Sequence, residues 1–159
     1  MKNYKLYNVF FPIWFLIFLP AAWLLVFPAN FAIDSAVLLL GAHFFLKGRA
    51  KEIWKKSILK VFVFGFLSDF VGAGFLTAGL FASSYFENST VFEEAINGAQ
   101  SVGAFFVLLF AVLVSAVCIY FVDLKISFKK IDAKVSEKKK LALLMAVATA
   151  PYTFFIPLY

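Results

Sequence analysis

Three titratable residues lie inside long apolar stretches of the sequence: Asp34, His43 and Asp69. Ionisable side chains are costly at membrane depth, and those found there commonly bind ions or transfer protons. Asp69 is the first candidate, because it lies about ten residues into its apolar stretch, and every lysine and arginine lies outside these stretches or, as Lys60 does, at the very start of one. Its carboxyl group must then be protonated, hydrogen-bonded, exposed to a water-filled cavity or bound to a cation. A structural role, in which Asp69 joins two helices by hydrogen bonds, is the alternative.

Asp34 is the second candidate for an ion- or proton-binding group. Two carboxyl groups that meet in a dry site share a proton or bind a cation, so Asp34 and Asp69 together would form such a site. The alternative is local. Asn30 lies four residues earlier and is a suitable helix N-cap, and a carboxylate in the first turn is stabilised by the helix dipole. Capping therefore explains Asp34 without any further function.

His43 is the third candidate, for a proton relay, because histidine titrates near neutral pH. It follows Asp34 by nine residues, which at 100° per residue places the two side chains on opposite faces of one helix. His43 also lies close to Lys47, so anchoring at the membrane surface is the alternative role.

Small residues flank Asp69 at helical spacing, and we predict three of them, Gly65, Gly72 and Ala73, as helix-packing residues. A face of small residues lets a second helix approach closely. Pro151 lies midway through the last apolar stretch, where a proline removes a backbone hydrogen bond and kinks a helix. Broken helices of this kind line the binding sites of many transporters.

The composition indicates the environment that these residues occupy. Hydrophobic residues make up 64% of the 159 residues and charged residues 15%, against roughly 45–50% and about 25% in ordinary soluble domains. A chain of this length cannot bury so much apolar surface in one core. The excess must face lipid, so we predict an all-α integral membrane protein.

The apolar stretches set the predicted spans, because a helix needs roughly 20 residues to cross the bilayer. We predict about five transmembrane helices in a single domain of residues 1–159, at about 8–27, 31–46, 59–86, 102–122 and 141–159. Residues 28–30, Pro-Ala-Asn, form the expected turn between the first two spans. A re-entrant hairpin over residues 8–46 is the alternative.

The basic residues predict the orientation. All 15 fall before the first span, between the second span and the start of the third (Lys60 being at that start), or between the fourth and fifth. Lysine and arginine concentrate in cytoplasmic loops, and five spans place all three groups there. The loop between the third and fourth spans holds only acidic charges: Glu87, Glu93 and Glu94. We therefore predict a cytoplasmic N-terminus and an outside C-terminus in a cell membrane, the bacterial plasma membrane being our expectation.

The residue inventory argues against most enzyme chemistry. One cysteine, Cys118, excludes an intrachain disulfide and a cysteine metal cluster built from this chain alone. The sequence contains no glycine-rich phosphate loop, no HExxH and no GxSxG motif. We therefore expect no cofactor and no metal, and we do not favour an enzyme. The net charge of +6 is grouped in the predicted cytoplasmic segments, so we expect lipid and not nucleic acid as the partner.

Intramembrane carboxyl groups favour a transport function over the alternatives. We expect a small transporter or channel, or a subunit of one, for a proton, cation or small solute. Five helices enclose little space, so a homo-oligomer is expected. The alternative is a non-catalytic accessory, assembly or immunity-type protein that acts on a membrane-protein partner through helix contacts. A lipid-modifying enzyme has the least support.

Overall fold

The computed structural model describes residues 20–46, 48–83 and 91–156, and over these residues the chain is helical, with no β-strand. The predicted all-helical class is therefore confirmed for the described residues. Three helical segments among them are long and apolar enough to cross a membrane: Val26–Phe45, Ala50–Ser83 and Val102–Ser127. This number is smaller than the predicted five, for reasons that lie in the first and last segments.

Helix α1 (Pro20–Phe45) runs without interruption through Pro28, so the turn predicted at residues 28–30 is wrong. A proline inside a helix costs about 3 kcal/mol. A turn in apolar surroundings would leave several backbone groups unpaired, at several kcal/mol each, so the continuous helix has the lower free energy. Residues 8–19 of the first predicted span lie outside the described residues.

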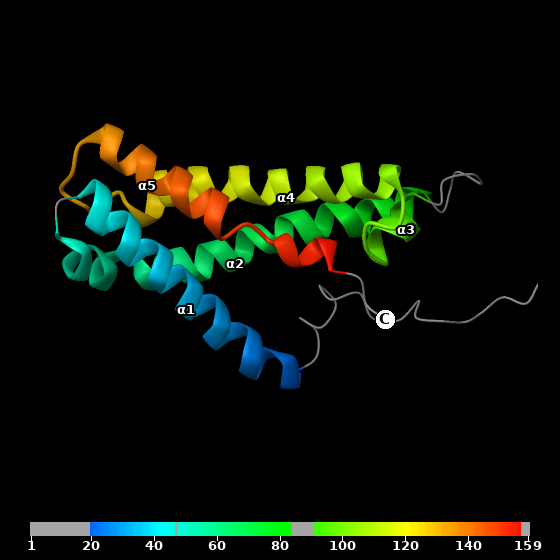
Figure 1. The fold of residues 1–159 in the computed structure, drawn as a ribbon, viewed down its shortest axis with the longest axis horizontal. Helices are drawn as coiled ribbons and strands as arrows, with labels where there is room; N and C mark the ends of the chain where they lie inside the picture. The colour runs from blue at the N-terminus through cyan, green and yellow to red at the C-terminus, as the bar shows by residue number, and fades with distance from the viewer. Residues whose placement is uncertain (1–19, 47, 84–90, 157–159) are drawn as a thin grey trace, which may run out of the picture.

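Helices α2 (Ala50–Ser83) and α4 (Val102–Val122) lie side by side along the length of the protein (Figure 1). They approach closely at Gly72, where an added Cβ would lie 2.9 Å from the Ala111 carbonyl oxygen. The short helix α3 (Val91–Ile96) lies beside α4 near its start. Helix α1 diverges from α2 toward its own N-terminal end (Figure 1).

The last segment is broken, not continuous as predicted for residues 141–159. After a π-helical turn, η2 (Asp123–Ser127), the chain reverses into α5 (Val135–Ala148), which spans only 14 residues. A break follows, and then a 3-10 turn, η3 (Tyr152–Phe155). The Phe155 ring lies 5.5 Å from the Phe105 ring near the start of α4. The broken segment therefore runs back along most of α4, although neither half is long enough to cross a membrane alone.

The described helices bury two separate cores. The basic-end core, beside the basic loops, consists of Leu38, Ala42, Leu46, Ile53, Ile58, Val61, Ile119, Phe128, Ile131, Leu141, Ala142, Met145 and Ala146. The acidic-end core, beside α3, consists of Ala73, Leu76, Ala95, Ala104, Leu108, Ala111, Val112, Ala150 and Phe154. Buried polar side chains lie between the two cores, among them Asp34, Ser68 and Ser115. The middle of the bundle is therefore a polar layer between two apolar cores.

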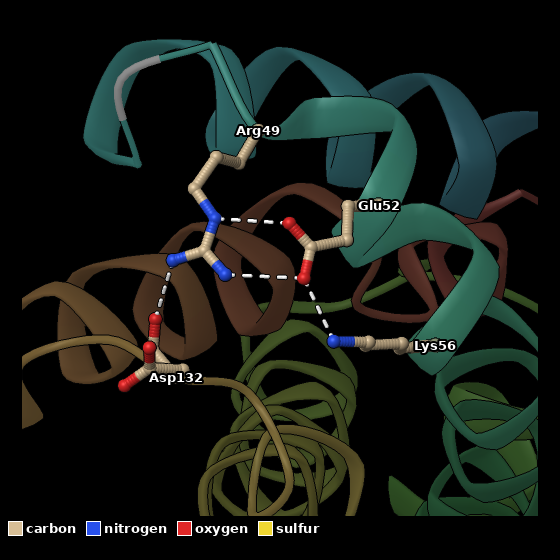
Figure 2. A network of polar contacts seen from close by, with 4 residues as sticks. All are labelled: Arg49, Glu52, Lys56 and Asp132. Atoms are coloured by element: carbon tan, nitrogen blue, oxygen red, sulfur yellow. Dashed lines mark hydrogen bonds and ion pairs between the residues drawn. The ribbon is translucent and has the colours of Figure 1, made fainter.

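Two basic segments that are distant in the sequence meet at one end of the bundle. Arg49 donates a hydrogen bond from Nη1 to the Asp132 carbonyl oxygen at 2.7 Å, and its Nε and Nη2 atoms donate to the Glu52 carboxylate (Figure 2). Lys56 donates to the same carboxylate at 2.7 Å. The hydrogen bonds to Glu52 raise the pKa of Arg49, which therefore stays charged at every physiological pH. This network joins the α1–α2 connection to the loop before α5.

Large apolar side chains are exposed on all three long helices. Phe44 on α1 is 75% exposed, Leu59 on α2 is 72% exposed and Phe106 on α4 is 61% exposed. Scattered exposed apolar residues are normal in water, but rows of large ones on every long helix are typical of a lipid-facing surface.

Candidate functional site

A cavity of about 450 Å³ opens in the polar layer between α1, α2 and the α5–η3 break. Residues of α1 and α2 line it together with residues 148–154. Both predicted carboxylates line it: Asp34 from α1 and Asp69 from α2. The break in the last segment therefore coincides with the site where the two acidic side chains meet.

Asp34 lies in the interior of α1 and is only 7% exposed. The capping interpretation is wrong, because Asn30 is itself inside the helix and begins nothing. A Cβ added at Gly65 of α2 would lie 3.9 Å from Oδ2 of Asp34. The missing side chain at Gly65 thus leaves free space directly beside this carboxyl group.

Asp69 lies across the cavity on α2, and its Oδ1 atom is buried with no hydrogen-bond partner among the described residues. Asp34 is near enough for the charges of the two carboxyl groups to interact. No lysine, arginine or histidine is among the described residues that line the cavity. A bound proton or cation is the chemical means of neutralising such a pair.

Backbone groups at the break are satisfied locally. Pro151 has no N–H to donate to the Val147 carbonyl four residues earlier, and the Tyr152 hydroxyl donates to that carbonyl instead, at 2.5 Å. The Thr149 hydroxyl donates to the Met145 carbonyl at 2.8 Å. Irregular backbone at membrane depth is tolerated where it is buried in protein or lines a cavity, and this break meets that condition.

Replacing Tyr152 by phenylalanine is expected to destabilise the protein by about 1–3 kcal/mol, the cost of leaving a carbonyl without its donor. The measurement is the free energy of unfolding in detergent. Tyr120→Phe is the control, since no described residue bonds to its hydroxyl group. Equal stability of both variants and the wild type would show that the Val147 carbonyl does not depend on Tyr152.

The other predicted site residues lie in different surroundings. His43 is exposed near the end of α1, with its ring 5.7 Å from that of Phe44, and it does not line the cavity. Gly72 faces α4, and Ala73 belongs to the acidic-end core. Gly65, the third predicted packing residue, lines the cavity, and a Cβ added to it would meet only Oδ2 of Asp34 within 4 Å.

Asp123 is a buried carboxyl group that the sequence analysis missed. It begins the π-helical turn η2, is 1% exposed and has an Oδ2 atom without a partner among the described residues. Its charge also interacts with that of Asp34. The spacing along the sequence is the signal that could have found it. Asp123 continues the four-residue series of Ala111, Ser115 and Ile119, and all four residues lie buried on one face. The apolar stretch ends at residue 122, which made Asp123 look like part of a loop.

The arrangement brings to one cavity two carboxyl groups that have no hydrogen-bond partner among the described residues. The described residues contain no group of three histidine, cysteine or acidic side chains able to hold a metal ion. Comparison with known proteins finds no matching family model, no matching curated protein and no matching solved structure.

Proposed function

We propose that this protein is a small membrane transporter, or a subunit of one, that moves protons or other cations through the cavity between α1, α2 and the α5–η3 break. Asp69 and Asp34 are the ion-binding groups, and His43 has no part in the pathway. The observation that carries the proposal is the convergence of both carboxyl groups on one cavity, with no basic side chain among the described residues of its wall.

The helix break supports this proposal. In transporters, discontinuous helices place free backbone groups and polar side chains at a binding site near the middle of the membrane. Here the break at Pro151 lies opposite Asp34 and Asp69 and adds Thr149 and Thr153 to the cavity wall. A purely structural carboxyl group would be expected to receive a hydrogen bond, and Oδ1 of Asp69 has none from a described residue.

The orientation that we propose follows the charges. The basic loops, which Arg49 joins to Asp132, face the cytoplasm, and α3 with Glu93 and Glu94 faces the opposite side. Helix α2 has 34 residues, about 51 Å, which exceeds the roughly 30 Å apolar layer. Its lysine-rich first turns therefore extend out of the lipid, in a cell membrane that we propose to be a bacterial plasma membrane.

The alternative function is a non-catalytic partner that binds through the small-residue face of α2, and two residues of this face already contact other parts of the protein. Gly72 and Ala73 are already occupied by contacts within the protein, since Gly72 faces α4 and Ala73 is buried in the acidic-end core. A homo-oligomer remains compatible with the transport proposal, because a few helices enclose little space.

The test is ion flux into proteoliposomes that contain the purified protein and a pH-sensitive dye, driven by an imposed membrane potential. We expect the wild type to move protons or cations faster than protein-free liposomes. We expect Asp34→Asn to lower the rate by roughly tenfold or more, because a neutral amide neither carries a proton nor balances a cation. The proposal is overturned if liposomes that contain the wild-type protein are no more permeable than protein-free ones to protons, alkali cations and organic cations.

A further inference from the structure

The cavity wall holds two carboxyl groups and no described basic side chain that could balance their negative charge. Asp34 is 7% exposed, lines the cavity and has no hydrogen bond or ion pair to another described residue. Asp69 on the opposite wall has an oxygen in the same condition. Ionised carboxylates in apolar surroundings are strongly unfavourable unless a positive charge is close by. A positively charged ligand would supply the counter-charge that the protein lacks at this site.

The size and the lining of the cavity narrow the kind of cation. A water molecule occupies about 30 Å³, whereas this cavity measures about 450 Å³, within the roughly 300–1,000 Å³ of small-molecule sites. A bare metal ion needs far less space and about six oxygen ligands or more. The cavity offers apolar and aromatic walls instead, with Phe62, Phe66 and Phe154 among them. Aromatic rings attract organic ammonium groups.

We infer that the cavity binds an organic cation, an amine or quaternary ammonium ion with apolar substituents, in exchange for a proton. The positive group lies between Asp34 and Asp69, and the substituents contact the aromatic wall. When the cation enters, one carboxyl group releases its proton to water, so the charge of the site is unchanged. This inference rests on the proposed function, whose ion-binding groups it uses, and it identifies the class of substrate.

A matched pair of probes tests the charge preference directly. Tetraphenylphosphonium and tetraphenylborate have nearly the same size and shape and opposite charges. We would titrate each into the purified full-length protein in detergent by calorimetry and subtract the signal of empty micelles. We expect saturable binding of the cation and at least tenfold weaker binding of the anion, which corresponds to about 1.4 kcal/mol.

Substitutions of the two carboxyl groups test whether the cation binds between them. Asp34→Asn and Asp69→Asn are each expected to weaken cation binding by roughly tenfold or more, the loss that follows from removing a charged partner. Glu93→Gln, on exposed α3 and outside the cavity, is the matched control and should bind as the wild type does.

Competition with protons gives a second measurement on the wild type. Cation affinity should rise by up to about tenfold per pH unit while one proton is displaced per cation. Three carboxyl groups contribute to this pH dependence: those of the pair, Asp34 and Asp69, and that of Asp123. The Tyr152 hydroxyl group is bonded to the Val147 carbonyl oxygen.

The results separate this inference from the transport proposal. Equal affinity for the two probes, or cation affinity unchanged in both asparagine variants, overturns the organic-cation site. Selective cation binding that depends on Asp34 and Asp69 supports it, even if proteoliposomes show no flux and transport itself fails. Proton flux without cation binding gives the reverse result, since it retains the transport proposal and overturns this substrate class.

Discussion

Replacement of Asp69 by asparagine is expected to reduce ion flux to the level of protein-free liposomes. The amide has nearly the same size as the carboxyl group but cannot release a proton or balance a cation. Because Oδ1 of Asp69 has no hydrogen-bond partner among the described residues, the substitution breaks no bond to that atom. We therefore expect the free energy of unfolding to change by less than about 1 kcal/mol. The substitution should therefore abolish ion flux and leave the free energy of unfolding nearly unchanged.

The measurement compares proton and cation flux in proteoliposomes with the unfolding midpoint and elution volume of the same preparation in detergent. Glu93→Gln, which removes an exposed acidic charge from α3, is the control and should keep full flux. Unaltered flux in a well-folded Asp69→Asn protein would eliminate Asp69 as the ion-binding group. Lost flux together with a large loss of stability would instead identify a structural carboxyl group.

Replacement of Gly72 by valine is expected to destabilise the protein by about 3 kcal/mol, at the upper end of the usual cost of overpacking. The first added atom would lie 2.1 Å from Oγ of Ser115 and 2.9 Å from the Ala111 carbonyl oxygen. The serine side chain can rotate away, but the carbonyl belongs to the backbone of α4. Helices α2 and α4 must therefore separate, and contacts of the acidic-end core are lost with them.

Gly74 provides a matched control on the same helix. A Cβ added there meets no atom within 4 Å, and the residue is exposed. Gly74→Val should change the free energy of unfolding by less than about 1 kcal/mol, because only helix propensity differs. Unfolding in detergent with increasing SDS measures both variants. Equal effects at the two positions would mean that α2 and α4 do not touch at Gly72.

The sequence predicted the features that depend on composition and helical periodicity. Apolar stretches predicted helices, and the described residues are helical. Nine-residue spacing predicted that Asp34 and His43 lie on opposite faces, and one is buried while the other is exposed. The possible meeting of Asp34 and Asp69 followed from similar depth, but their placement on one cavity depends on how α1 and α2 pack, which a single sequence does not encode locally.

The wrong predictions have a common physical origin. Residues 28–30 look like a turn by the rules for chains in water, where freed backbone groups bond to solvent. Pro28 instead remains in α1, because an apolar environment penalises a turn more than an interior proline. At Pro151 the chain does break, since the Tyr152 hydroxyl replaces the missing donor there. A nearby substitute donor is a tertiary feature, and proline positions alone do not reveal it.

The separation of the two cores has a mechanical consequence. Each end of the bundle is packed around its own apolar interior, while the layer between them contains the cavity and the break at Pro151. Densely packed regions resist deformation, so bending concentrates where packing is thinnest. A small rocking of one end against the other would widen the middle layer on one side and narrow it on the other, and neither interior would have to rearrange. In such a motion, Asp34 and Asp69 would lie in the layer that changes shape.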